Sequence, residues 1–176
     1  MDKGNMDQSS TYALWLLPDA GETTVLQLAM DRINEAVPGP QFQPHLTLIE
    51  RIHGDEDELK QRVVSLAGQM SSFTAEPEKL VHSQSYFRAV YVRLKPSADM
   101  LRCRQLGAET FKLRLDKSYQ PHISLLYSAM PRYKKLSALD PVHLSLPSDY
   151  NLNRLALVRI ALSVSDWEII CEASLS

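Results

Sequence analysis

The sequence predicts an α+β protein with two sheet-containing lobes and helices on the outside. The phrase QPHLTL, residues 43–48, returns almost unchanged as QPHISL, residues 120–125. Each copy also ends a strand–helix–strand pattern of matching length: His45 lies 30 residues after Trp15, and His122 lies 30 residues after Val92. A duplicated unit of this kind usually packs about a pseudo-two-fold axis. We therefore expect the two histidines to face each other.

The first strand and helix are predicted from an apolar run and a periodic stripe. Tyr12 to Leu17 is short, apolar and followed by Pro18, which is typical of a buried strand. Thr24 and Gln27 match a capping box, which predicts a helix start there. The apolar face of this helix consists of Leu26, Met30, Ile33 and Val37, and the run Pro38-Gly39-Pro40 ends it. The first histidine strand follows, from His45 to about Ile52.

The second helix begins in an acidic run after Gly54. Asp55 to Glu58 are all acidic, and the helix dipole favours negative charge in a first turn. A metal-binding cluster is the alternative interpretation of this run, and a solvated first turn is the better one. The buried stripe of the helix is Leu59, Val63, Leu66 and Met70. A weaker extended region runs from Phe73 to His82.

The second half of the chain repeats this order of predicted elements, a strand, a helix and a histidine strand. Tyr86 to Leu94 is rich in aromatic and β-branched residues and predicts a strand. A helix starting at Pro96 and Ser97 carries Met100, Leu101, Ala108 and Phe111, and the second histidine strand runs from His122 to Ser128. The remaining predicted elements are a short helix, Tyr133 to Leu139, and two closing strands, Leu155 to Val164 and Glu168 to Ala173.

Each repeated phrase presents an imidazole and a hydroxyl on one face. Successive strand side chains point to opposite faces, so His45 shares a face with Thr47, and His122 shares one with Ser124. The residue before a proline is biased towards extended backbone, so Gln43 and Gln120 lead in without helix. Two such units facing each other would form a pocket with two proton-transfer groups and two hydroxyl donors.

The paired H-x-[ST] phrases resemble the 2H phosphoesterase superfamily. Four sequence segments are most similar to its cyclic nucleotide phosphodiesterase branch. They are PHLTL, HISLLYS, YALWLLP from Tyr12, and YFRAVYV from Tyr86. The resemblance implies one bilobal domain over residues 12–176, with antiparallel sheets and a central cleft between lobes centred on 45–48 and 122–125. Residues 1–11 are expected to be a disordered leader, because residues 1–10 are polar and lack the apolar centre of a signal peptide. The resemblance also implies a place in RNA metabolism such as tRNA splicing.

The resemblance implies a metal-independent cyclic phosphodiesterase. Its substrates would be 2′,3′-cyclic nucleotides or ADP-ribose 1″,2″-cyclic phosphate, opened to phosphomonoesters. Histidine, with a pKa near 6.5, can give or take a proton near neutrality, so His45 and His122 are the expected acid and base. Which one is the acid stays open. Thr47 and Ser124 could donate to the phosphate oxygens; the structural alternative is that both pairs only satisfy the sheet.

Aromatic residues are further candidates for substrate binding. Tyr127 matches a family tyrosine that contributes to the pocket, although on a flat strand it would lie opposite Ser124. Trp15 matches a family tryptophan near the site, and Tyr86 and Phe87 could stack on a base. Core packing is the competing interpretation for each of the four. Arg88 could balance phosphate charge, or it could only solvate the outer face of its strand.

The amino-acid composition limits which binding partners and substrates can be expected. The net charge is −2, with 19 basic and 21 acidic residues, which disfavours a long nucleic acid held by its phosphates. No apolar run is long enough to span a membrane. Two distant cysteines, Cys103 and Cys171, favour free thiols in a reducing cytoplasm. We expect a cytoplasmic monomer with a small cyclic phosphate substrate and no cofactor or metal. Two alternatives remain: a 2H enzyme acting on RNA ends, at terminal cyclic phosphates or 2′–5′ linkages, and a non-catalytic nucleotide- or RNA-binding module.

Overall fold

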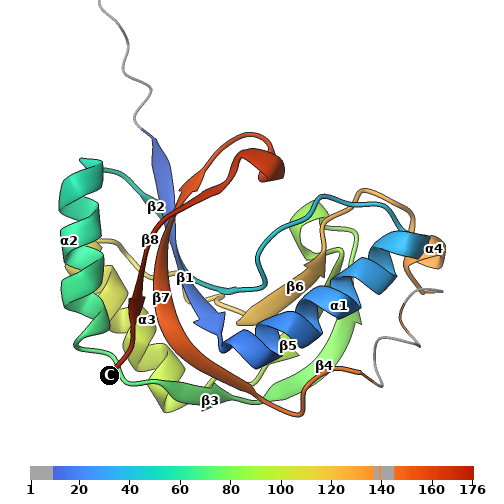
Figure 1. Cartoon of the computed structure of the whole chain (residues 1–176), viewed down its shortest axis with the longest axis horizontal. Helices are drawn as coiled ribbons and strands as arrows, with labels where there is room; N and C mark the ends of the chain where they lie inside the picture. The colour runs from blue at the N-terminus through green and yellow to red at the C-terminus, as the bar shows by residue number, and fades with distance from the viewer. Residues whose placement is uncertain (1–9, 137–138, 140–144) are drawn as a thin grey trace, which may run out of the picture.

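A computed structural model describes residues 10–136, 139 and 145–176. In these residues, eight antiparallel strands form one continuous sheet (Figure 1). The strand order is β3-β7-β1-β2-β6-β5-β4, with β8 also pairing with β7. The strands are β1 (Thr11–Pro18), β2 (Leu46–Ile52), β3 (Phe73–Ala75), β4 (Pro77–His82), β5 (Val90–Leu94), β6 (His122–Leu126), β7 (Tyr150–Ile160) and β8 (Glu168–Ser174).

The sheet divides into two halves at the contact between β2 and β6. Only one residue pair, Leu46 with Ile123, joins these strands, whereas β1 pairs with β2 and β5 pairs with β6 over most of their lengths. Strands β1 and β2 correspond to β5 and β6 in the repeat, and both histidine strands lie beside the junction. The α+β class and the two pseudo-symmetric lobes with antiparallel sheets are therefore confirmed.

The two repeat units exchange their helices. The helices are α1 (Ala20–Ala36), α2 (Glu56–Ala67), α3 (Ala98–Phe111) and α4 (Arg132–Leu136). Helix α1 follows β1 in the chain but packs mainly on β6, and α3 follows β5 but packs mainly on β2. In Figure 1, α2 and α3 lie on one side with β1 and β7, and α1 lies on the other with β5 and β6. Each lobe thus combines strands of one repeat with the helix of the other.

Helix starts follow the capping residues. The acidic run forms the first turn of α2, where Asp55 accepts hydrogen bonds from the backbone N–H groups of Asp57 and Glu58. The described residues contain no cluster of three or more potential metal-ligating side chains. The expected start of α1 at Thr24 is wrong, because Asp19 caps the helix five residues earlier and the Thr24 hydroxyl donates to the Ala20 carbonyl inside it.

Several strand boundaries also differ from the predictions. Tyr86–Arg88 is a 3₁₀ turn, so the strand begins only at Val90. Ser83 stabilises this turn, because its hydroxyl donates a hydrogen bond to the Arg88 carbonyl at 2.6 Å. The extended region after Phe73 divides into β3, which pairs with β7, and β4, which pairs with β5, so the chain crosses between lobes there.

The predicted elements near the two ends of the chain differ from the structure by smaller amounts. The long strand β7 starts at Tyr150 rather than Leu155, and Val164 lies in a 3₁₀ turn beyond its end. The predicted helix from Tyr133 is α4, and its expected continuation through residues 137 and 138 lies outside the described residues. Strand β1 begins at Thr11, inside the segment expected to be a leader; residues 1–9 of that segment are also outside the description.

The main core lies between the sheet and the helices α1, α2 and α3. The opposite face of β1 and β7 carries a second, smaller apolar cluster of Ala13, Trp15, Leu17, Ala156 and Val158. No helix in the described part of the chain is long and apolar enough to cross a membrane. Cys103 and Cys171 are free thiols.

Candidate active site

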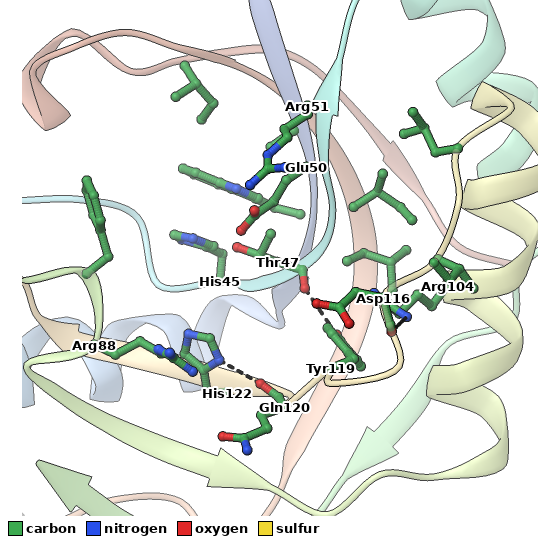
Figure 2. Close-up of a pocket in the computed structure, with 18 of the residues that line it drawn as sticks. His45, Thr47, Glu50, Arg51, Arg88, Arg104, Asp116, Tyr119, Gln120 and His122 are labelled. Carbon is green, nitrogen blue, oxygen red and sulfur yellow. Dashed lines mark hydrogen bonds between the residues drawn. The ribbon is translucent and has the colours of Figure 1, made fainter. Parts of the chain in front are cut away.

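Both histidine motifs open into one cavity of about 840 Å³. The first lobe contributes the face of β1 and β2 that is turned away from the main core, from Trp15 and His45 to Thr11 and Arg51. The second contributes His122, Tyr127 and the turn around Phe87, and the segment that leads into β6 closes one side. Figure 2 shows the imidazoles of His45 and His122 facing each other across this space.

Both imidazoles are held in the same tautomer by the same local contact. Nδ1 of His45 lies 2.6 Å from the Gln43 carbonyl oxygen, and Nδ1 of His122 lies 2.8 Å from that of Gln120. A carbonyl can only accept a hydrogen bond, so each Nδ1 carries the proton. In the neutral rings Nε2 is therefore unprotonated, which leaves it available for proton transfer.

Burial keeps both histidines neutral in the free protein. His45 is 5% exposed, and its ring stacks on Trp15 with ring centroids 3.5 Å apart. Burial lowers its pKa from 6.5 to about 3, a shift that the Gln43 hydrogen bond opposes and the charge of His122 reinforces. Burial also lowers the pKa of His122; the Gln120 hydrogen bond and Glu50 oppose this shift, and Arg88 adds to it. An anionic phosphate between the rings would raise both pKa values.

The two hydroxyls of the motifs do not occupy equivalent environments. Thr47 lines the cavity beside His45 (Figure 2). Among the described residues its hydroxyl has no hydrogen-bond partner, so it is available to a ligand. Ser124 is buried outside the cavity wall, and its hydroxyl donates to the Phe87 carbonyl at 2.9 Å. In this conformation Ser124 therefore holds the Phe87 turn and does not reach the cavity.

Three of the four predicted aromatic residues line the cavity. Trp15 forms the floor beneath His45, Tyr127 follows the end of β6, and Phe87 is half exposed at the rim. The chain leaves the strand at Leu126, which is why Tyr127 can turn into the cavity. Tyr86 does not line it; its ring lies perpendicular to Phe87 with centroids 5.0 Å apart, and 6.3 Å from the centroid of Tyr127.

Trp167 also lines the cavity, although no sequence pattern predicts it there. Its ring lies 5.8 Å from Trp15 and 6.0 Å from Phe87, between centroids, and it is nearly parallel to Phe87 at 19°. The indole N–H donates to the Ala161 carbonyl, which fixes the ring at the rim. Trp167 comes from the connection between β7 and β8, and no local pattern links that connection to the histidine motifs.

Folding also gathers basic residues around the cavity. Arg88 lines it and is the basic residue that acts on the pKa of His122. Arg51, Arg104 and Arg114 line it as well, whereas Arg93 lies outside the wall and faces Glu78. The acidic side chains of the wall are Glu50 and Asp116. The cavity therefore carries a positive excess although the whole chain is slightly acidic.

A tyrosine ties the segment before His122 to the other lobe's motif. The Tyr119 hydroxyl donates to the Thr47 carbonyl at 3.1 Å (Figure 2). Arg104 on α3 lies over the Tyr119 ring, 4.0 Å from its centroid, and donates to the Asp116 carbonyl. Repetition of Gln43 and Gln120 could have revealed the tautomer contacts, but the residue that matches Tyr119 in the first copy is Phe42, which has no hydroxyl to donate.

A bilobal antiparallel fold with one H-x-[ST] motif on each side of a central cavity defines the 2H phosphoesterase superfamily. The model of the family described as cyclic phosphodiesterase-like protein matches residues 10–175. The chain belongs to this family and is a cyclic phosphodiesterase enzyme.

Similar proteins agree with this assignment. The cyclic phosphodiesterase of Arabidopsis thaliana is 24% identical over 177 residues, covering 96% of this chain and 97% of its own. Among solved structures, Escherichia coli LigT in its apo form has a TM-score of 0.61 at 15% identity and covers 96% of this chain and 98% of LigT. TT0787 of Thermus thermophilus has a TM-score of 0.59 at 17% identity, with coverages of 94% and 97%. Both structures share the fold.

Proposed function

We propose that this enzyme hydrolyses 2′,3′-cyclic nucleotides or ADP-ribose 1″,2″-cyclic phosphate to phosphomonoesters by two-histidine acid–base catalysis. The observation that carries the proposal is the pair of imidazoles facing one cavity, each with Nδ1 bound to a carbonyl. Both Nε2 atoms are free for proton transfer, and no metal ion is needed for either transfer.

The reaction follows from this arrangement. One histidine takes a proton at Nε2 from a water molecule, whose oxygen attacks phosphorus and forms a new P–O bond. The bond from phosphorus to one ribose oxygen breaks on the opposite side, and the other histidine, protonated at Nε2, gives its proton to that oxygen. Opposed histidines suit this in-line geometry. Either can take either role, according to how the substrate lies.

Thr47 and Arg88 would stabilise the phosphate in the transition state. The Thr47 hydroxyl is available beside His45, and Arg88 supplies positive charge next to His122. The nucleobase would stack on the rim aromatics Phe87 and Trp167, whose rings lie nearly parallel. Solved structures of LigT include complexes with 3′-AMP, ATP and NADP⁺, which supports a nucleotide-sized ligand here.

The test is turnover of 2′,3′-cyclic mononucleotides with the 2′- and 3′-monophosphate products resolved. His45→Ala and His122→Ala should each lower kcat by roughly 10²–10⁴-fold, the range for a lost general acid or base. Circular dichroism should show that both variants remain folded. A folded His122→Ala protein with wild-type turnover would exclude this mechanism.

An RNA-end-processing activity is the second candidate, and one observation favours it. The arginines of the cavity wall supply a local positive field that the net charge does not reveal. The comparison is kcat/KM for a cyclic mononucleotide against a short RNA with the same terminal cyclic phosphate. An RNA advantage of about tenfold or more that shrinks with added salt would favour RNA ends. A non-catalytic binding module would turn over neither substrate.

A further inference from the structure

The connection between β4 and β5 carries two side chains of the cavity wall. This turn, residues 83–89, contains Phe87 at the rim and Arg88, which lies beside His122 (Figure 2). A surface connection lacks the regular hydrogen bonds of a sheet or helix, so neighbouring segments have to supply its partners. The placement of both side chains therefore depends on which groups hold the turn.

The middle of the turn is bound to the strand that carries His122 and to the residues that follow it. The Ser124 hydroxyl donates to the Phe87 carbonyl at 2.9 Å, and the backbone N–H of Ser128 donates to the Tyr86 carbonyl at 3.1 Å. Both donors are neutral groups. They fix the turn against β6 but leave its first residues to be held by other contacts.

Ser83 closes the start of the turn and connects it to Arg88. Its backbone N–H donates to the Ala89 carbonyl at 3.0 Å. Its hydroxyl donates to the Arg88 carbonyl at 2.6 Å and accepts from the Ser85 N–H at 3.1 Å. Its carbonyl accepts from Nζ of Lys135 at 2.9 Å. A continuous path of hydrogen bonds thus runs from the Lys135 ammonium through Ser83 to the backbone of Arg88.

Lys135 is a buried cation that lies outside the cavity wall. It belongs to α4, and its side chain is 0% exposed. Burial lowers the pKa of its ammonium group. Removing an ammonium from water is costly unless its hydrogen bonds are good. In return, a charged donor forms a stronger hydrogen bond to a carbonyl than a neutral donor does. Lys135 is therefore the strongest of the donors that hold this turn.

We infer that Lys135 is a positioning residue for the reaction: through the Ser83 carbonyl it fixes the turn that holds Arg88 beside His122. The inference rests on the proposed function, because the action of Arg88 on the phosphate is part of that proposal. Lys135 does not act on His122 directly, since the charged side chains that shift the pKa of His122 are Arg88 and Glu50. An effect of Lys135 on His122 must therefore pass through Arg88.

The first test is a double-mutant cycle on kcat/KM for 2′,3′-cyclic AMP. Lys135→Met replaces the cation with an apolar residue of similar length and should lower kcat/KM by about tenfold, typical of one lost charged hydrogen bond. In an Arg88→Met background the same change should cost less than about twofold, because the side chain that it positions is absent. Lys79→Met, at an exposed site on β4, is the matched control and should have no effect in either background. Losses that add in the double variant would overturn the inference.

The pH profile separates positioning from a purely structural role. Burial and the charge of Arg88 lower the pKa of His122, Glu50 opposes them, and His45 faces the ring across the cavity. Displacing Arg88 should raise this pKa. The limb of the kcat/KM profile that reports His122 should then move to higher pH in Lys135→Met, as in Arg88→Met. A protein that is merely less stable would lose activity without moving this limb, and that result would also overturn the inference.

Hydrogen–deuterium exchange gives a readout that does not need turnover. In Lys135→Met the amides of residues 83–89 should exchange faster, whereas those of β5 should not. Ser83→Ala breaks the next link of the path without changing charge. It should give the same exchange pattern and the same dependence on Arg88, so the test survives if Lys135→Met fails to fold.

The exchange data also separate this inference from the proposed function. A wild-type enzyme that turns over no cyclic phosphate, together with faster exchange of residues 83–89 in both variants, would remove the proposed function and keep Lys135 as the residue that fixes the turn. Unchanged exchange in these residues would overturn the role of Lys135 whatever the substrate is.

Discussion

At the residue scale, the two carbonyls of Gln43 and Gln120 decide what the histidines can do. Each fixes the proton on Nδ1 and leaves Nε2 bare towards the cavity. The contact is to a residue two positions earlier, so the repeated phrase itself carries it. The hydroxyls of the same phrases behave differently, because Ser124 meets the Phe87 carbonyl and Thr47 meets no such acceptor.

This asymmetry predicts different kinetics for Thr47→Val and Ser124→Ala. Thr47→Val removes a donor facing the phosphate and should lower kcat by roughly 10²–10³-fold, the range for one oxyanion donor. Ser124→Ala leaves the Phe87 carbonyl without its donor and should raise KM more than it lowers kcat. Steady-state kinetics on a cyclic mononucleotide separate the two, with Thr74→Val on the exposed side of β3 as control. Equal losses of kcat would mean that Ser124 rotates into the cavity when substrate binds.

The buried imidazole of His45 predicts a pH-dependent stability. Its pKa is about 3 in the folded protein against 6.5 for the ordinary group, so the unfolded chain binds an extra proton in between. His45 neutrality stabilises the fold fully above pH 6.5, and this contribution is lost as the pH falls towards 3. The slope is about 1.4 kcal/mol per pH unit. Urea titrations between pH 7 and 4.5 should show a steeper decline for the wild type than for His45→Gln; parallel declines would contradict the burial effect.

At the scale of elements, the exchange of α1 and α3 between lobes makes the cavity depend on both repeats. Helix α1 packs on β6, which carries His122, and α3 packs on β2, which carries Thr47 and follows His45. Gly39, after the end of α1, is a point of close approach in this arrangement. A Cβ there would lie 2.6 Å from the Tyr127 carbonyl oxygen and 2.8 Å from Cδ1 of Leu126.

Gly39→Ala should therefore destabilise the protein and displace the end of β6. The contact involves backbone, which cannot move away cheaply, so we expect a loss of about 1–3 kcal/mol, typical of overpacking. Thermal unfolding measures it, and KM should rise because Tyr127 shifts. Gly68→Ala is the matched control: the nearest atom to its added Cβ would be 3.6 Å away and its φ is −66°, so it should be neutral or slightly stabilising. Similar melting temperatures for the two variants would contradict this account.

At the scale of the whole molecule, the cavity joins residues from nearly the full length of the chain, from Thr11 to Trp167. Its working groups are imidazoles, a hydroxyl and arginines. Hydroxyls and guanidinium groups are poor ligands beside the Cys, His and carboxylate sets that metals prefer. The chemistry proposed here requires the two imidazoles to exchange protons with the substrate.

Catalysis should accordingly survive removal of divalent metals. Enzyme dialysed against EDTA should hydrolyse a cyclic mononucleotide at the rate of the untreated protein, and added Mg²⁺, Mn²⁺ or Zn²⁺ should not raise it. The initial rate in metal-free buffer is the measurement. Activity lost on chelation and restored by one specific divalent ion would contradict the two-histidine mechanism.

The sequence by itself determined the repeated motifs and most elements. Side-chain alternation in a strand is a local property, so the phrases alone predict that His45 shares a face with Thr47. The same holds for the apolar stripes of α1 and α2, which the structure buries, whereas in α3 Met100 and Ala108 are buried but Leu101 is 49% exposed. Errors at the start of α1 and at Tyr86 arose where a neighbouring capping residue or loop hydrogen bond overrode propensity.

Only the tertiary structure decided which groups meet in the cavity. The exchange of α1 and α3, the arrival of Trp167 from the β7–β8 connection and the convergence of Arg51, Arg104 and Arg114 depend on how whole faces are buried. Ser124 was placed on the correct strand, yet its hydroxyl found an acceptor 37 residues earlier in the chain, at Phe87. Periodicity fixes a side chain relative to its own strand, whereas its partners are fixed by the packing of all the apolar surfaces together.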